Sequence, residues 1–324
     1  MNTKPKLIRS FATAVLMLTS LSSFAAEPLK ELRVDWAYYS PSSLVLKRLG
    51  WLEQDFKKDG IAVRWLQSQG SNKALEYLNS NSTDFGSTAG LSALLAKANG
   101  NPIKNVYIYS QPEWTALVVS KDSPIRTVQD LKGKKIAATK GTDPYLFLLR
   151  TLQSNGLKRS DIEHVHLQHA DGKAALLRGQ VEAWAGLDPH MAAAQLNDGA
   201  RLIYRNVDFN TYGFLNVREE FARQHPEHVK RVLAAYEKAR HWILDHPKET
   251  AQIISEEAKL ALPVAELQLE RNNFADPVPG YAHIKALGAA APILIAEGLV
   301  KPGVDLDKML KDLIEPIYAQ AVIH

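Results

Sequence analysis

The sequence predicts an α/β protein built as two lobes of one design, and three observations lead to this fold class. Short apolar strands alternate with amphipathic helices, which is typical of parallel sheets covered by helices. The same order of segments occurs a second time, about 100 residues further along the chain. The length of 324 residues gives enough chain for two compact units.

The N-terminus has the pattern of a secretory signal over residues 1–25. Three basic residues, Lys4, Lys6 and Arg9, precede the apolar run 11–21, and small residues stand at the cleavage positions. The apolar run is too short to span a membrane. We therefore expect a cleavable signal peptide and export to the periplasm. Cleavage lowers the formal net charge from +4 to +1, because the leader holds three basic and no acidic residues.

Composition excludes several classes of function. The chain is 46% hydrophobic and 23% charged, as in a soluble globular protein. Its small net charge after cleavage gives no support to a polyanionic partner, and no basic stripe with stacking aromatic residues predicts nucleic-acid binding. Cysteine is absent, which excludes thiol nucleophiles and cysteine-ligated metal sites. A secreted chain of this size without cysteine fits the bacterial periplasm.

The first lobe is predicted from three strand and helix pairs. Leu32, Val34 and Trp36 alternate as a strand, and Ser40 with the following proline then starts a helix. The remaining elements are a strand at 61–66, the turn 70–72 with a helix at 73–78, a short strand at 84–88, and a helix at 91–98.

The second lobe repeats this pattern. Residues 131–156 correspond to the first strand and helix, and residues 172–190 correspond to the segment from 72 to 90. Within it, 134–152 is predicted as a strand, a polar turn and a helix that begins at Asp143 and Pro144. Asp143 either caps its own helix or faces a ligand. The lobes are expected at 26–118 and 119–209, and residues 210–324 return to the first lobe and form five C-terminal helices.

The turns between strands and helices are the predicted binding site, because ligands of parallel sheets bind at the carboxyl ends of the strands. The repeat pairs Ser40 with Asp143, Ser71 with Asp171, and Ser87 and Thr88 with Asp188. Hydroxyl groups and helix N-termini suit an anion that is a weak base. The carboxylates would repel this anion unless they serve as helix caps or bind a cationic group of the same ligand.

Aromatic residues accompany these turns and could cover the organic body of a ligand. They are Trp36, Tyr38, Tyr39, Trp114, Tyr145, Trp184 and Tyr212. For Trp36 and Trp184, a place in the core is an equal alternative.

Catalytic and metal-binding patterns are weak. His164, His166 and His169 lie close together, but no carboxylate spacing completes a metal site. The sequence has no H-E-x-x-H, G-x-S-x-G or P-loop motif. We expect no metal, no cofactor and no catalytic residue.

Three segments carry a family resemblance: 84–96 (DFGSTAGLSALLA), 120–142 (SKDSPIRTVQDLKGKKIAATKGT) and 181–190 (VEAWAGLDPH). With these segments the chain resembles the periplasmic substrate-binding proteins of ABC importers, in the aliphatic-sulfonate and taurine group related to nitrate-binding and pyrimidine-synthase-like proteins. The resemblance implies a two-lobed type II periplasmic binding protein clamshell, a monomer that closes around a sulfonate and delivers it to a membrane permease. It also implies anion contacts at Ser87, Thr88, Gly141 and Thr142.

The expected ligand is an alkanesulfonate or a taurine-like zwitterion. A sulfate ester or another small anion, an enzyme of the pyrimidine-synthase type and a periplasmic sensor are the alternatives. Two departures from the family pattern concern the ligand's body: Asp143 and Pro144 follow Thr142, and Leu187 replaces the usual aromatic residue before an Asp-Pro pair. The full set of expected ligand-binding residues is Tyr38, Tyr39, Ser40, Gly70, Ser71, Ser87, Thr88, Trp114, Gly141, Thr142, Asp143, Trp184 and Asp188.

Overall fold

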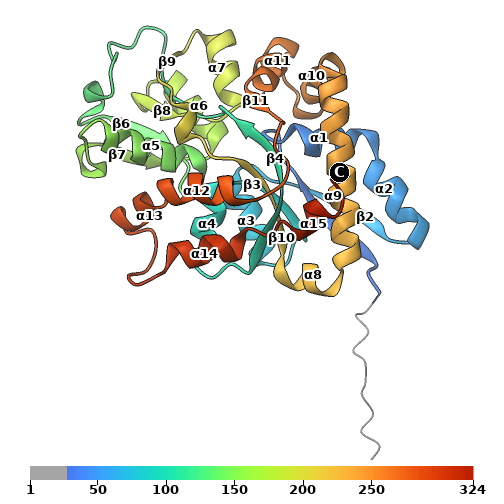
Figure 1. Cartoon of the computed structure of the whole chain (residues 1–324). Helices are drawn as coiled ribbons and strands as arrows, with labels where there is room; N and C mark the ends of the chain where they lie inside the picture. Colours follow the sequence, from blue (N-terminus) through green and yellow to red (C-terminus); the bar gives the residue numbers. More distant parts are fainter. Residues whose placement is uncertain (1–27, 324) are drawn as a thin grey trace, which may run out of the picture.

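The computed structural model describes residues 28–323, so the predicted signal peptide at 1–25 lies outside the described residues. Two β-sheets, each with helices packed around it, form two lobes that lie side by side (Figure 1). No helix within the described residues is both long enough and apolar enough to cross a membrane.

The first sheet has six strands in the order β11-β4-β10-β3-β1-β2. β1 pairs in parallel with β2 and β3, whereas β10 is antiparallel to β3 and β4. β10 follows the second lobe in sequence, so the first lobe is completed only when the chain returns to it. The strands are β1 (Glu31–Trp36), β2 (Ala62–Gln67), β3 (Phe85–Ala89), β4 (Ile103–Pro112), β10 (Gly213–Arg218) and β11 (Asn272–Asn273).

The second sheet has five strands in the order β7-β6-β8-β5-β9. β6 pairs in parallel with β7 and β8, and β5 is antiparallel to β8 and β9. This order repeats that of the first sheet, in which β1 lies between β2 and β3. The strands are β5 (Leu117–Val119), β6 (Lys135–Ala138), β7 (Glu163–His166), β8 (Ala183–Ala185) and β9 (Arg201–Tyr204).

The chain crosses between the sheets twice, at 113–116 and at 205–212. β5 already pairs within the second sheet from Leu117, slightly before the expected boundary at 118/119. The two crossings are tied together because Thr115 N–H donates to Asn210 Oδ1 at 2.8 Å. They form a short double connection between the two sheets.

Helices that follow the parallel strands begin at the predicted turns. In the first lobe they are α1 (Pro41–Leu49), α2 (Trp51–Phe56), α3 (Ser71–Asn79) and α4 (Gly90–Ala98). In the second lobe they are α5 (Asp143–Ser154), α6 (His169–Leu177) and α7 (His190–Asp198). Proline stands in the first turn of both α1 and α5, where its missing N–H costs no hydrogen bond.

The C-terminal part contains more helices than the five predicted. They are α8 (Glu219–Gln224), α9 (Pro226–Asp245), α10 (Pro247–Ala258), α11 (Leu262–Glu270), α12 (Tyr281–Ala290), α13 (Pro292–Ala296), α14 (Leu306–Leu313) and α15 (Ile317–Gln320). The single helix expected over 283–297 is wrong, because Pro292 starts a new helix after α12 ends. Pro316 likewise divides α14 from α15 within the helix expected over 308–321.

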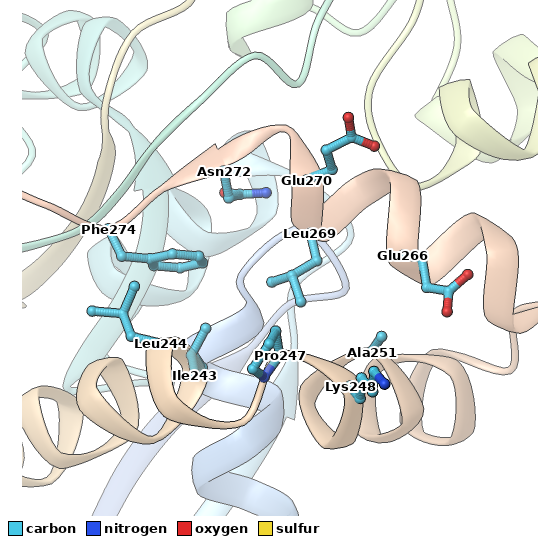
Figure 2. Close-up of a pocket in the computed structure, with 10 residues that line it drawn as sticks. All are labelled: Ile243, Leu244, Pro247, Lys248, Ala251, Glu266, Leu269, Glu270, Asn272 and Phe274. Atoms are coloured by element: carbon cyan, nitrogen blue, oxygen red, sulfur yellow. The ribbon is translucent and has the colours of Figure 1, made fainter.

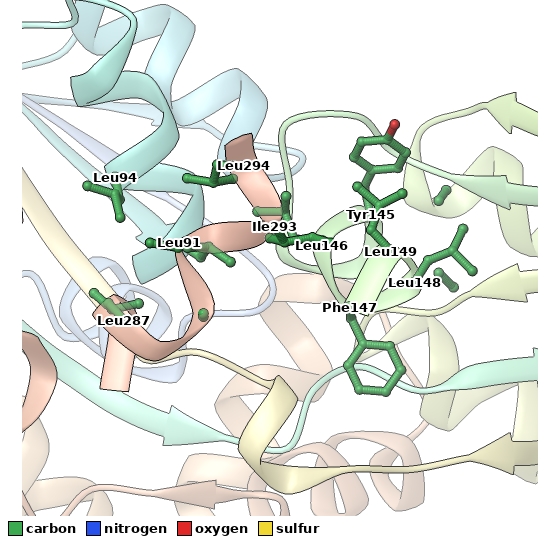
Figure 3. Packing of buried hydrophobic residues seen from close by; sticks show 14 of the residues in the cluster. Leu91, Leu94, Tyr145, Leu146, Phe147, Leu148, Leu149, Leu287, Ile293 and Leu294 are labelled. Atoms are coloured by element: carbon green, nitrogen blue, oxygen red, sulfur yellow. The ribbon is translucent and has the colours of Figure 1, made fainter. Parts of the chain in front are cut away.

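One apolar cluster joins the two lobes. α4 of the first lobe contributes Leu91 and Leu94, and α5 of the second lobe contributes side chains that include Leu146 (Figure 3). Leu287 of α12 and residues of α13 fill the space between them. Burial of each such leucine stabilises the fold by about 1.5–3 kcal/mol, so the C-terminal helices hold both lobes.

Candidate functional site

The predicted turns of the two lobes face one another. A Cβ atom on Gly70, at the start of α3, would lie only 2.8 Å from Nε2 of His169, at the start of α6. The rings of Tyr38 and His190 meet edge to face, with centroids 4.8 Å apart. Helix N-termini from both lobes therefore point into one interface, where their unpaired N–H groups and dipoles favour an anion.

Two buried hydroxyl groups in this interface keep an O–H available. Ser40 precedes α1, and its Oγ has no hydrogen-bond partner among residues 28–323. Ser71 Oγ accepts the N–H of Ala89 at 2.9 Å, and within the described part of the chain no acceptor takes its own proton. Both side chains are almost completely buried. Of the hydroxyl-bearing residues predicted for the site, Ser40 and Ser71 are the two whose proton has no acceptor among residues 28–323.

The other predicted hydroxyl groups donate to the protein itself. Ser87 Oγ donates to Asp35 at 3.0 Å, Thr88 Oγ1 donates to the carbonyl of Ala89 at 3.1 Å, and Thr142 Oγ1 donates to the carbonyl of Thr139 at 2.6 Å. In this arrangement these three side chains position the turns, and they have no proton left for an anion.

Asp35 is a buried carboxylate that no sequence pattern predicted. It lies on β1 and accepts the N–H of Ser87 at 2.9 Å as well as the Ser87 hydroxyl. Burial raises the pKa of Asp35 to about 6, and the hydrogen bonds from Ser87 oppose this shift. Asp35 therefore fixes the turn after β3 from the neighbouring strand.

Asp143 does not cap its own helix, so the predicted capping role is wrong, and its carboxylate is bonded to donors of the protein. Thr142 occupies the N-cap position, and Asp143 is the first residue of α5. Its carboxylate accepts Nε1–H of Trp114 and both the N–H and the O–H of Thr211, all at 2.9 Å. Burial raises the pKa of Asp143, and these bonds oppose the shift. Asp143 thus ties the second lobe to both crossings.

Asp188 is also occupied by protein donors. It accepts the N–H of Ala192 at 2.8 Å and pairs with Nη1 of Arg271 at 3.0 Å. Arg271 directly follows α11 and also donates to Gln195 Oε1 at 2.5 Å. Burial raises the pKa of Asp188 to about 6, and the charge of Arg271 opposes this shift. The pair joins the two lobes, and nothing in the local sequence predicted Arg271.

The structure separates the predicted aromatic residues into two groups. Tyr39 donates its O–H to the carbonyl of Ser87 at 2.9 Å, and its ring meets that of Trp114 edge to face. Tyr38 also contacts Tyr39, so three of the four aromatic residues in the expected ligand-binding set gather at the turns. Trp184 lies instead in the core of the second lobe, packed against Gly172.

The two predicted glycines are needed for different reasons. Gly141 has φ +76°, a left-handed conformation that side chains disfavour, and the site of its missing Cβ lies 3.6 Å from Cβ of Asn72. Gly70 allows the ring of His169 to approach the backbone of the opposite lobe.

His169 is the counterpart of Ser71 in the second lobe, and the predicted counterpart Asp171 is wrong. α6 begins at His169, two residues before Asp171, and Asp171 lies exposed within the helix. His169 Nδ1 lies 3.3 Å from Thr139 Oγ1, which itself donates to a carbonyl, so the ring places its proton on Nδ1. Its buried Nε2 has no partner among the described residues.

This buried imidazole makes stability depend on pH. Burial lowers the pKa of His169 from 6.5 to about 3. Between these two pKa values the unfolded chain binds a proton and the folded ring does not. The contribution of His169 to the free energy of unfolding is therefore present above pH 6.5 and is lost as the pH falls toward 3. Asp35 and Asp188 act in the opposite direction, because their raised pKa values of about 6 give stability below pH 3.8 that is lost as the pH rises through 6.

The variant His169→Gln isolates the histidine contribution, because both carboxylates remain. When the pH is lowered from 6.5 to 4.5, the carboxylates change the free energy of unfolding equally in both proteins. We expect the overall change to be about 1–3 kcal/mol less unfavourable in the variant than in the wild type. Urea denaturation at a series of pH values measures this difference. Parallel pH profiles for the two proteins would show that His169 is not held neutral by burial.

The described part of the chain also has a surface groove away from the predicted site. A groove of about 400 Å³ lies between α9, α10 and α11, and Leu244, Leu269 and Phe274 are among its apolar lining residues (Figure 2). None of the predicted site residues lines it. No group of three or more His, Asp or Glu side chains within residues 28–323 is arranged to hold a metal ion.

Comparison with known proteins establishes the family. A family model described as NMT1/THI5 like matches residues 44–250. The chain belongs to this family. A relative from Escherichia coli (strain K12), named as an aliphatic sulfonates-binding protein, is 30% identical over 298 residues, which cover 91% of this chain and 93% of the relative.

Solved structures support the same assignment. The alkanesulfonate-binding protein SsuA from Xanthomonas axonopodis pv. citri, bound to MOPS, has a TM-score of 0.81 and 29% identity, covering 90% of this chain and 99% of that protein. The periplasmic aliphatic sulphonate binding protein SsuA from Escherichia coli has a TM-score of 0.75 and 27% identity, covering 89% of this chain and 93% of that protein. The predicted two-lobed fold and the family resemblance are confirmed. All three relatives are named as binding proteins.

Proposed function

We propose that this protein is the solute-binding component of an ABC importer and that it captures a small organosulfonate between its lobes. The observation that carries the proposal is the pair of buried hydroxyls, Ser40 and Ser71, at helix N-termini that face the opposite lobe. A sulfonate is a weakly basic anion, so hydrogen-bond donors and helix dipoles suffice to bind it without a proton or a metal. The sulfonate-binding names of the relatives support the same ligand class.

Within this class, a simple alkanesulfonate fits better than a zwitterion such as taurine. An ammonium group needs a carboxylate, and Asp143 and Asp188 are both already bonded to donors of the protein. Asp35 is likewise bonded to Ser87. The proposed ligand therefore has no positive charge close to its sulfonate.

The proposal describes a binding protein without catalysis. Ligand contacts to both lobes would favour the closed form, and the closed form would dock as a monomer on a permease. The signal pattern at residues 1–25 supports a periplasmic location.

The variant Ser40→Ala tests the proposed contact. It breaks no internal hydrogen bond of the Ser40 side chain within the described residues, so the fold should keep its stability. Loss of one hydrogen bond to a charged ligand costs about 1.5–3 kcal/mol, and we expect ethanesulfonate to bind about 10- to 150-fold more weakly. Isothermal titration calorimetry measures this loss.

Ser80→Ala is the matched control, because Ser80 is exposed at the end of α3. Equal affinities of the wild type and Ser40→Ala would show that Ser40 does not contact the ligand. Absence of binding by the wild type to any sulfonate would contradict the proposed function itself.

A further inference from the structure

A pocket of about 480 Å³ lies at the end of the first lobe that is opposite to the candidate sulfonate site. It is lined from the starts of β1 and β3, from the end of β10 and from α8, which lies at the lower end of the molecule in Figure 1. The candidate sulfonate site is at the other, carboxyl ends of β1 and β2. β1 has six residues and is therefore about 20 Å long, so the two places are separate.

We propose that this pocket is a second anion site, which binds a small doubly charged oxyanion such as phosphate or sulfate. The inference goes beyond the proposed function and does not depend on it, because the pocket contains none of the residues assigned to the sulfonate.

The lining of the pocket carries more positive than negative charge. Lys30, Arg33 and Arg218 are its cations, and Asp84 is its only acid. His225 also lines the pocket, and burial lowers its pKa from 6.5, so the ring is neutral at weakly alkaline pH. Three cations against one carboxylate leave an excess of two positive charges, and a concave surface concentrates the field of such an excess.

Asp84 is shared between the two arginines and cannot neutralise both. Its carboxylate, almost completely buried, accepts Nε–H and Nη2–H of Arg33 at 3.1 and 2.6 Å and Nη2–H of Arg218 at 2.9 Å. Arg33 directs its remaining donors to Asn81. Arg33 therefore holds Asp84 in place, and Arg218 is the cation whose charge remains in excess.

Arg218 is mostly buried and only partly satisfied. Its side chain is 11% exposed, and its buried Nε has no hydrogen-bond partner among residues 28–323. Nη1 approaches the exposed Glu220 at 3.4 Å, which is long for a hydrogen bond. An oxyanion in the pocket can replace this long contact, and the planar fork of a guanidinium group suits the oxygens of phosphate or sulfate.

Further donors line the same pocket. Lys30 is exposed just before β1 and presents an ammonium group with three donors. The half-buried imidazole of His225 contributes one N–H when it is neutral. The pocket thus combines guanidinium, ammonium and imidazole donors around a volume that is ample for one tetrahedral ion.

Calorimetry of the mature protein with sodium phosphate, at low salt and weakly alkaline pH, tests the inference. We expect one-to-one binding that sodium chloride at the same ionic strength does not reproduce. Arg218→Gln should weaken phosphate binding at least about tenfold, because it removes charged donors to the ion. Lys30→Gln should weaken it about two- to fivefold, since an exposed charge contributes less. Sulfate should give the same order of variants.

Arg218→Gln is expected to fold, because Asp84 keeps its bonds to Arg33. If it unfolds, the double variant Lys30→Gln/His225→Gln replaces it and should weaken phosphate binding more than Lys30→Gln alone. Lys301→Gln is the matched control, because Lys301 is exposed and does not line the pocket.

Two further measurements locate the ion. Ser40→Ala should bind phosphate as the wild type does, and Lys30→Gln should bind ethanesulfonate as the wild type does. Absence of phosphate binding, a loss in the pocket variants no greater than in Lys301→Gln, or a loss in Ser40→Ala instead would overturn the inference. Failure of the wild type to bind any sulfonate would overturn the proposed function and leave this second site intact.

Discussion

Replacing Asp143 with alanine is expected to lower the free energy of unfolding by about 3–5 kcal/mol. The substitution leaves three buried donors without an acceptor: Nε1–H of Trp114 and the N–H and O–H of Thr211. Each such donor costs about 1–3 kcal/mol, and the energy regained by no longer burying a carboxylate offsets part of the total. Urea denaturation followed by tryptophan fluorescence or circular dichroism measures the change.

Asp122→Ala is the control, because Asp122 lies exposed in a turn and the substitution should change stability by less than about 0.5 kcal/mol. Asp143→Asn should lose less than Asp143→Ala, since the amide keeps one acceptor oxygen. If Asp143→Ala were as stable as the control, the carboxylate would not hold the crossings.

Replacing Arg271 with glutamine is expected to weaken alkanesulfonate binding by about 10- to 100-fold. Arg271 and Asp188 come from different lobes and form a buried ion pair at 3.0 Å. Without Arg271, closing the lobes would bury the charge of Asp188 unpaired, and an unpaired buried charge costs about 3–5 kcal/mol. Part of this cost is avoided in the open form, where water can reach Asp188, so the loss should be observed mainly in ligand affinity.

The double variant Arg271→Gln/Asp188→Asn should recover part of the affinity, because it removes the charge that was left unpaired. Arg178→Gln provides the control, since Arg178 is exposed at the end of α6. Calorimetry of the wild type, the single variants Arg271→Gln and Asp188→Asn, and the double variant gives the coupling between the two residues. Unchanged affinity in Arg271→Gln would show that the ion pair does not stabilise the closed form.

Local patterns in the sequence were sufficient to predict most of the fold. The alternation of apolar residues predicted the strands. A serine or aspartate followed by proline, at Ser40 and at Asp143, predicted the first residues of α1 and α5 to within one position. The repeat predicted two related sheets, and the structure has the same strand order in both, β2-β1-β3 and β7-β6-β8. The divided C-terminal helices were missed because the apolar spacing continues across Pro292 and Pro316.

The partners of the buried charges could not be predicted in the same way. Asp143 binds Trp114 and Thr211, which are 29 and 68 positions away, so a local capping rule assigns it the wrong role. Arg271 is 83 positions from Asp188. The sequence repeat matches Ser71 with Asp171, whereas α6 begins two residues earlier, at His169. For this reason the repeat did not predict His169 as the counterpart of Ser71.

The most direct test of the account is a crystal structure with 2-bromoethanesulfonate, in which anomalous scattering locates the bromine. We predict that the sulfonate oxygens lie within hydrogen-bond distance of Ser40 Oγ and Ser71 Oγ, between the N-termini of α1 and α3 and the opposite lobe. Bromine located only in the groove lined by Leu244 and Phe274, or ligand absent from the interface at saturating concentration, would contradict the claim that the two lobes bind a sulfonate between them.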